Sequence, residues 1–218
     1  MTVRNVVFDL DGTLIDSSDG VVEAVNYSLR KMGEAEQRPE VIKAFIGYPL
    51  SQMYPQFTRA PVRELYRHFQ QKAAETVVSS TDILPGVELT LHRLKATGFQ
   101  LAIASTKIRR HIDGIVEKFC WHDLISAYSG GDEVEKVKPD PEILLLTLRR
   151  MGAMPAETIV VGDTVNDVLA ARAVPMKVVG INSPYGGREK VIDAGPDYFI
   201  DSIEELVELL DNLKKEAV

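Results

Sequence analysis

Short runs of consecutive apolar residues recur along the chain and are separated by segments with a helical repeat. Five such runs predict strands, at residues 3–10, 101–104, 125–128, 159–161 and 177–181. Uninterrupted apolar runs of this length are typical of strands in a parallel sheet, where both faces are covered. The pattern therefore predicts a central sheet of at least five buried strands.

The segments between these strands carry helix signals. Val87, Leu91 and Leu94 share one helical face, and Gly98 marks the end of that helix. Asp140 before Pro141 predicts a second helix that ends at Gly152, and Ser202 with Glu205 forms a capping-box pattern that opens a third. Because strands alternate with helices, we expect an α/β fold with a doubly wound, parallel, Rossmann-like sheet.

Residues 17–82 interrupt this alternation. They contain no convincing strand pattern, whereas Val21, Val25, Leu29 and Met32 line one helical face up to Gly33. Further helices are expected at 38–45, 50–57 and 62–77. The prediction is an all-helical cap domain at 17–82, inserted into an α/β catalytic core formed by 1–16 and 83–218.

Composition narrows the possible functions. The chain has 218 residues, of which 45% are hydrophobic and 26% charged, as in a globular protein. A single cysteine excludes an intrachain disulfide and a cysteine-based zinc site. The net charge of −7 without a basic stripe argues against nucleic acid as a partner. Without an apolar stretch of membrane-spanning length or an export signal, we expect no membrane partner and a cytoplasmic location. The sequence leaves a monomer and a homodimer both open.

Polar residues follow the predicted strands. They are found in the segments Asp9-Leu10-Asp11-Gly12-Thr13, Ser105-Thr106-Lys107 and Gly162-Asp163-Thr164, with Asp167 close behind and Lys138 before the helix that leads into the fourth strand. A single residue of this kind is most often only a helix cap or a solvated side chain. The set is more informative, because the carboxyl ends of parallel strands meet at one edge of the sheet, where ligands bind.

Four carboxylates would converge at that edge, those of Asp9, Asp11, Asp163 and Asp167. Two like charges 4 Å apart repel by about 4 kcal/mol at an effective dielectric constant of 20, so the cluster requires a cation. Oxygen ligands without histidine or cysteine favour Mg²⁺. Together with a hydroxyl and a lysine, this set suits phosphoryl transfer through an aspartyl-phosphate.

These motifs resemble the four motifs of the haloacid dehalogenase superfamily, in its phosphatase branch. The first motif matches Asp9 to Leu14, the second Ser105, the third Lys138 and the fourth Gly162 to Asp167, in the family's order. The insert at 17–82 resembles the family's all-α cap. The phosphoglycolate phosphatases and the related pyrophosphatases are the most similar group.

The resemblance implies a role for each residue. Asp9 is implied as the nucleophile, and Asp11 as the acid and base. Mg²⁺ would be held by Asp9, the main-chain carbonyl of Asp11 and Asp163, with Asp167 close by or acting through water and orienting Lys138. Phosphate oxygens would be bound by Gly12, Ser105, Thr106 and Lys138.

The substrate implied is a small phosphorylated metabolite, with phosphoglycolate or pyrophosphate favoured. Thr106 departs from the asparagine that phosphoglycolate phosphatases usually carry there, and the Ser105-Thr106-Lys107 string is closer to the pyrophosphatases. In similar proteins, a turn such as Gly47-Tyr48 faces the active site and selects the leaving group; a plain connector between helices is the other interpretation. Two other functions stay open, a sugar-phosphate mutase like β-phosphoglucomutase and a phosphoryl-accepting signalling receiver.

Overall fold

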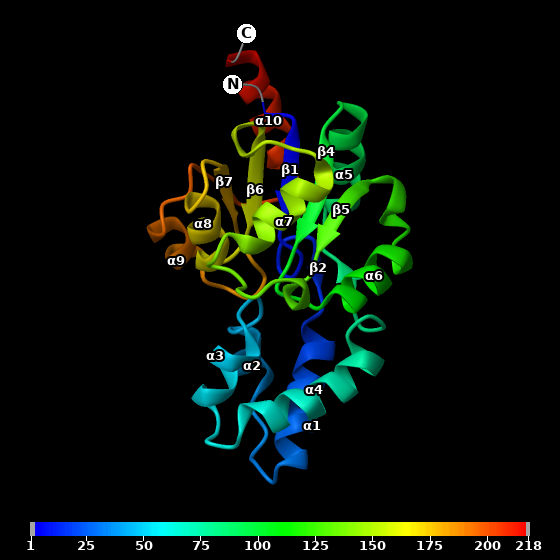
Figure 1. Cartoon of the computed structure of the whole chain (residues 1–218), viewed down its shortest axis with the longest axis vertical. Coiled ribbons are helices and arrows are strands. Elements are labelled where there is room, and N and C mark those ends of the chain that lie inside the picture. The colour runs from blue at the N-terminus through cyan, green and yellow to red at the C-terminus, as the bar shows by residue number, and fades with distance from the viewer. Residues whose placement is uncertain (1–2, 217–218) are drawn as a thin grey trace.

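A computed structural model describes residues 3–216, and its centre is a six-stranded parallel sheet (Figure 1). The strand order is β5-β4-β1-β6-β7-β8. Its strands are β1 (Asn5–Phe8), β4 (Gln100–Ala104), β5 (Ile125–Ser129), β6 (Thr158–Gly162), β7 (Lys177–Ile181) and β8 (Tyr198–Ile200). Because β1 pairs with β4 on one side and β6 on the other, chain segments far apart in sequence end side by side.

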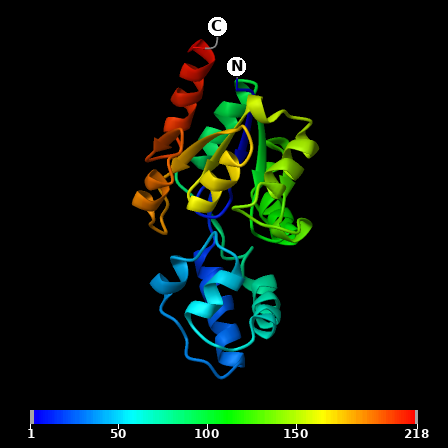
Figure 2. The same ribbon diagram turned by 60° about the vertical axis from the view of Figure 1, so that its left-hand side comes forward.

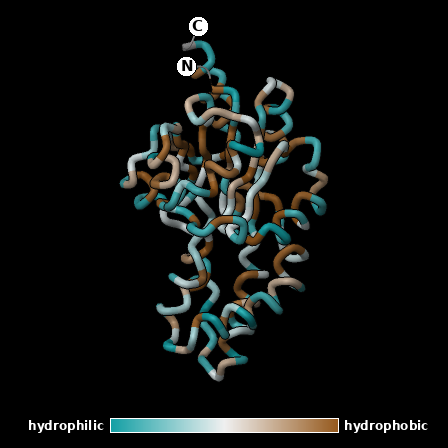
Figure 3. The backbone as a smooth tube through the Cα atoms, in the orientation of Figure 1, coloured by the Kyte–Doolittle hydropathy of each residue, from teal (hydrophilic) through white to brown (hydrophobic). Residues whose placement is uncertain are grey.

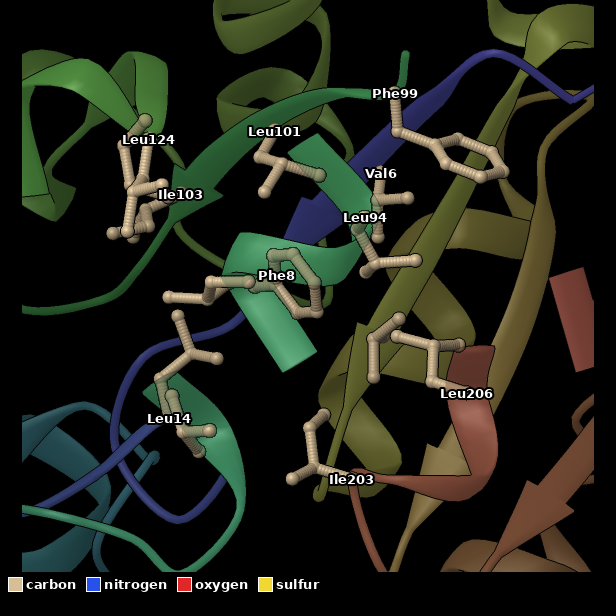
Figure 4. Packing of buried hydrophobic residues seen from close by; sticks show 14 of the residues in the cluster. Val6, Phe8, Leu14, Leu94, Phe99, Leu101, Ile103, Leu124, Ile203 and Leu206 are labelled. Carbon is tan, nitrogen blue, oxygen red and sulfur yellow. The ribbon is translucent and has the colours of Figure 1, made fainter. Parts of the chain in front are cut away.

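Helices cover both faces of this sheet, as a doubly wound fold requires. One face packs on α5 (Val87–Ala96), α6 (Arg109–Lys118) and α10 (Glu205–Glu216), where Phe8, Leu94 and Leu206 meet (Figure 4). The other face packs on α7 (Glu142–Met151), α8 (Val165–Arg172) and α9 (Arg188–Asp193). Both faces of the central strands are therefore buried, which explains their continuous apolar runs; brown segments gather in the interior of this part of the molecule in Figure 3.

A second layer of helices lies beyond the carboxyl ends of the strands, at the end of the molecule opposite the chain termini (Figures 1 and 2). It comprises α1 (Ser18–Lys31), α2 (Pro39–Lys43), α3 (Leu50–Met53) with the 3-10 helix η1 (Tyr54–Gln56), and α4 (Val62–Thr76). These helices have their own apolar cluster, which includes Leu29, Ile42 and Leu65. The chain enters and leaves this layer through β2 (Ile15–Asp16) and β3 (Asp82–Ile83), which pair antiparallel.

The predicted fold class is confirmed, and all five predicted strands are present. The insert is helical, whereas the exact domain limits at 16/17 and 82/83 stay predictions. The segment predicted as one helix at 50–57 is broken into α3 and η1 where Pro55 interrupts the backbone hydrogen bonds. The C-terminal helix begins at Glu205 instead of Ser202, although the Glu205 side chain does accept from the Ser202 N–H at 2.9 Å.

Among residues 3–216, no helix combines the length and the apolar character needed to cross a bilayer.

Candidate active site

The residues predicted to carry chemistry follow three neighbouring strands. Asp9 directly follows β1, Ser105 follows β4, and Asp163 follows β6. Since β1 lies between the other two strands, their carboxyl ends bring these side chains to one place. All three residues are buried. The convergence expected from the sequence is therefore present in the fold.

Lys138 lies among the acidic residues and contacts two of them. Its ammonium group donates to Asp9 Oδ1 at 2.7 Å, to Asp167 Oδ1 at 2.6 Å and to the carbonyl of Ala104 at 2.6 Å. The Lys138 side chain is only 2% exposed, so these contacts are screened little by water. Although burial opposes its charge, the carboxylates of Asp167 and Asp9 raise the pKa of Lys138 above its ordinary value. The lysine is a fixed cation at the centre of the cluster.

Asp167 is oriented by contacts at the start of α8, in whose first turn it lies. The hydroxyl and the main-chain N–H of Thr164 donate to Asp167 Oδ2 at 2.6 and 3.0 Å. The Asp167 N–H in turn contacts the Thr164 hydroxyl at 3.3 Å, which completes a capping box at the start of α8. One carboxylate oxygen is thus used by the helix cap, and the other meets Lys138.

Asp163 is a buried carboxylate with only neutral partners. The Thr13 hydroxyl donates to its Oδ1 at 3.2 Å, and the Ser183 hydroxyl lies near the carboxyl group and favours its charged form, lowering its pKa. Within residues 3–216, no lysine, arginine or histidine forms an ion pair with Asp163. A buried charge without a counter-ion is costly, so this carboxylate calls for a cation.

Oxygens of Asp9, Asp163 and Asp167 all lie within 4.8 Å of one another. Burial raises the pKa of Asp9 to about 7; repulsion from Asp167 adds to this rise, and Lys138 only partly offsets it. Burial, with repulsion from Asp9 and Asp167, also raises the pKa of Asp163. Three hard oxygen donors with excess negative charge fit a small divalent cation such as Mg²⁺. The Asp11 side chain is not part of this group.

Gly12 packs tightly against the cluster, at a φ of +83° that favours glycine. A Cβ atom at this position would overlap the Asp163 carboxylate and lie 2.8 Å from Ser183 Oγ. The backbone can therefore approach the acidic site only because residue 12 has no side chain.

We expect Gly12→Ala to lower the free energy of unfolding by roughly 1–3 kcal/mol, because it adds both backbone strain and a steric overlap. It should also displace Asp163 and reduce activity. Thermal unfolding and initial rates measure the two effects. Gly33→Ala, where a Cβ would meet nothing within 4 Å although φ is also positive, is the matched control for strain alone. Equal losses in both variants would contradict the role of close approach.

Ser105 and Thr106 lie in the loop that follows β4. Ser105 is 1% exposed, and its Oγ accepts from the Lys107 N–H at 3.2 Å, which fixes the turn. Thr106 Oγ1 lies 3.5 Å from the carbonyl of Gly47, which belongs to the helical insert. The loop therefore lies between the acidic cluster and the insert.

The Asp11 side chain is fixed by two residues for which the sequence predicted no role. The Lys107 ammonium lies 3.1 Å from Asp11 Oδ2, and the Ser17 hydroxyl donates to Asp11 Oδ1. Lys107 also reaches Ser17 Oγ at 3.3 Å. Lys107 directly follows two predicted phosphate contacts, and this position in the sequence could have indicated that it lies near the site. Ser17 immediately precedes α1, so its contact links Asp11 to the insert.

The turn at Gly47-Tyr48 lies against the catalytic edge. A Cβ at Gly47 would come within 2.8 Å of the Thr164 side chain, and Tyr48 contributes to two cavities on either side of the turn. Burial, together with the nearby charges of Asp167 and Asp163, raises the pKa of Tyr48. The turn is therefore close enough to the acidic cluster for the substrate-selecting role, which stays a prediction.

A cavity of about 510 Å³ opens beside Asp11, Thr106 and Lys107 and extends under the helical insert. His111 on α6 lines it as well, although the sequence offered no reason to place this histidine near the site. The smaller cavity, about 90 Å³, is lined by Asp163, Tyr48 and Tyr185. Asp11 thus faces the large cavity, and Asp163 the small one.

Three comparisons with known proteins bear on this site. A family model described as haloacid dehalogenase-like hydrolase matches residues 6–181. A phosphoglycolate phosphatase from Psychrobacter arcticus is 32% identical, over 96% of this chain and 96% of that protein. The pyrophosphatase PpaX from Anoxybacillus flavithermus is 30% identical, over 96% of this chain and 98% of that protein. A crystal structure of a haloacid dehalogenase-like hydrolase from Bacteroides fragilis superimposes with a TM-score of 0.88. It is 28% identical and covers 94% of this chain and 100% of its own.

Proposed function

Because this chain belongs to the haloacid dehalogenase-like hydrolase family, we propose that it is a Mg²⁺-dependent phosphatase that works through an aspartyl-phosphate on Asp9. That it is a hydrolase of phosphate esters follows from its family and its phosphatase relatives. The observation that best supports the mechanism is the buried Lys138 ammonium between Asp9 and Asp167, with Asp163 in the same cluster.

In the first step, an Asp9 carboxylate oxygen attacks the phosphorus atom of the substrate, and the bond from phosphorus to the ester oxygen breaks. Asp11, which must carry a proton when the substrate is bound, gives that proton to the departing oxygen, which leaves as an alcohol. Asp11 suits this task because it lines the large cavity, where a leaving group would lie. Lys107 and Ser17 hold its carboxyl group at the entrance to that cavity.

In the second step, a water molecule attacks phosphorus and gives a proton to Asp11, and the bond from phosphorus to Asp9 breaks. Inorganic phosphate leaves, and both carboxyl groups return to their starting states. Asp9 must be ionised for the first attack, whereas burial raises its pKa to about 7. Positive charge beside Asp9 favours the ionised form, and Lys138 supplies part of that charge.

The remaining positive charge is assigned to Mg²⁺. Asp9, Asp163, Asp167 and the main-chain carbonyl of Asp11 would hold the ion, which when bound offsets the charge of the carboxylates and of the transferred phosphoryl group. The buried Asp163, which has no ion pair within residues 3–216, supports this assignment. Lys138, the Gly12 and Thr106 backbone and Ser105 would hold the phosphoryl oxygens.

Phosphoglycolate and pyrophosphate are the reference substrates, because two relatives carry these names. Gly47 and Tyr48 are the residues proposed to contact the leaving group. The sugar-phosphate mutase requires a sugar hydroxyl in place of water in the second step, and the signalling receiver requires a stable phosphoprotein. Phosphate release with many turnovers separates the proposed phosphatase from both.

We expect the purified protein to release phosphate from 4-nitrophenyl phosphate and from at least one metabolite ester when Mg²⁺ is present. Excess EDTA should abolish this activity, and added Mg²⁺ should restore it. Mg²⁺ should also raise the melting temperature more at pH 8 than at pH 5, because protons compete for the Asp9 carboxylate below its pKa of about 7. Full activity in EDTA after exhaustive dialysis would contradict the metal assignment.

A further inference from the structure

The cavity beside Asp11 defines where the alcohol part of a substrate must lie. Asp11 is the proposed proton donor to the ester oxygen, so the leaving group has to enter the cavity that Asp11 lines. At about 510 Å³ this cavity is in the range of sites for drug-sized ligands. The few atoms of glycolate or of a second phosphate would leave most of it to water.

The wall of the cavity opposite the core is apolar. It is built by one face of α4, which carries Val62, Tyr66 and Phe69, and by Phe45 and Leu50 from the α2–α3 region. Tyr66 is 40% exposed although it is a large aromatic residue. Gln70 donates to the Tyr66 hydroxyl at 2.6 Å, which holds the ring in place on the helix. Half-exposed aromatic side chains gathered on one wall are typical of a surface that binds an apolar group.

The polar residues of the cavity add little net charge. Lys107 is paired with Asp11, and the exposed Asp132, which accepts from the main-chain N–H of Arg109, carries a charge opposite to that of Arg63. Burial, with the nearby charges of Lys107 and Arg110, lowers the pKa of His111 to about 4, so its imidazole is neutral at pH 7. The Nε2 atom of His111 is buried and has no hydrogen-bond partner within residues 3–216. Arg63, which is exposed, is the remaining cation of the lining.

We infer that the substrate is a phosphomonoester whose alcohol carries a flat, uncharged ring, which stacks against the Tyr66 and Phe69 wall beneath the helical insert. This inference rests on the proposed phosphatase function and specifies its substrate class. A second carboxylate or phosphate would have to be desolvated against apolar side chains, whereas a ring buries apolar surface there. His111, which lines the cavity, is uncharged there and so adds no charge that would favour an ionic substrate.

Two matched pairs of esters test this inference. Uridine 5′-monophosphate and ribose 5-phosphate share the same primary ester, as do 2-phenylethyl phosphate and ethyl phosphate, and only one member of each pair carries the additional ring. We expect the ring to raise kcat/KM by roughly 10- to 100-fold in at least one pair. Phosphoglycolate should be hydrolysed less efficiently than that ring-bearing ester. Thermal shifts with the same four esters report binding without turnover.

Tyr66→Ala should bring the preference for the ring close to one, in kcat/KM and in the thermal shift. The control is Tyr27→Ala, which removes an aromatic residue from α1 that does not line the cavity and should keep the preference. A wild-type enzyme that hydrolyses phosphoglycolate without any ring preference overturns this inference and leaves the phosphatase function standing. So does a preference for phosphoglycolate that Arg63→Gln removes. Absence of hydrolysis with every ester, alongside ring-dependent thermal shifts, overturns the phosphatase function instead.

Discussion

Asp9→Asn should abolish phosphate release while the protein stays folded. The amide has nearly the same shape as the carboxylate, but its oxygen is not a nucleophile, so no aspartyl-phosphate can form. We expect kcat to fall roughly 10⁴-fold or more, as for other enzymes that lose a covalent nucleophile. Initial rates with 4-nitrophenyl phosphate in Mg²⁺ measure this loss.

The dependence of this variant's stability on pH can be predicted from the charge that the substitution removes. Burial raises the pKa of Asp9 to about 7 in the metal-free protein, above the value of an unfolded chain. The associated stability is therefore complete below about pH 4 and is lost as the pH rises through 7. The amide that replaces the carboxyl group does not ionise, so we expect the metal-free variant to lose less stability between pH 5 and 8 than the wild type.

Asp123→Asn is the matched control, because Asp123 is exposed and lies far from the cluster in the 3-10 helix η2 (Trp121–Asp123). It should retain wild-type rates and the wild-type dependence of stability on pH. Residual activity of Asp9→Asn above about one per cent, after deamidation of the asparagine has been excluded by mass spectrometry, would remove Asp9 as the nucleophile.

The position of Asp9 could be predicted because a local signal combines with a general rule of parallel sheets. A continuous apolar run predicts a buried parallel strand, and such strands place their carboxyl ends at one edge of the sheet. The same reasoning located Ser105 and Asp163, since their strands flank β1 in the sheet. Periodicity also identified the helical insert, whose four helices correspond to four predicted ones.

Contacts between distant segments could not be predicted in this way. The pairing of Lys107 with Asp11 depends on the rotamers of both side chains and on the path of the chain near Ser17. The strand β8 has three residues, too few for an apolar run to stand out, and β2 and β3 have two residues each. The cavity wall at Tyr66 and Phe69 arises only when α4 packs beside the core, because the same helical stripe is equally consistent with an ordinary apolar core.

Lys138→Met tests whether the acidic cluster depends on the positive charge of the lysine. Methionine fills a similar volume but leaves Asp9 and Asp167 without their shared cation and the Ala104 carbonyl without its donor. We expect a loss of activity of roughly 10³-fold or more, because a preorganised charge beside the phosphoryl group is removed. In metal-free protein at pH 8, the free energy of unfolding should fall by about 3–5 kcal/mol, as when one partner of a buried ion pair is deleted.

The loss of stability should depend on both pH and Mg²⁺, which distinguishes a charge effect from a packing defect. At pH 5 the carboxyl group of Asp9, whose pKa burial raises to about 7, can take up a proton and reduce the repulsion. Added Mg²⁺ should recover part of the stability at pH 8 without recovering activity, because the ion offsets charge in the cluster but does not replace the ammonium hydrogen bonds. Lys136 is an exposed lysine two residues away, so Lys136→Met should change neither the activity nor the free energy of unfolding. A Lys138→Met protein whose stability loss is the same at pH 5 and pH 8, and is unaffected by Mg²⁺, would show that the lysine is a packing element and that the acidic cluster does not need its charge.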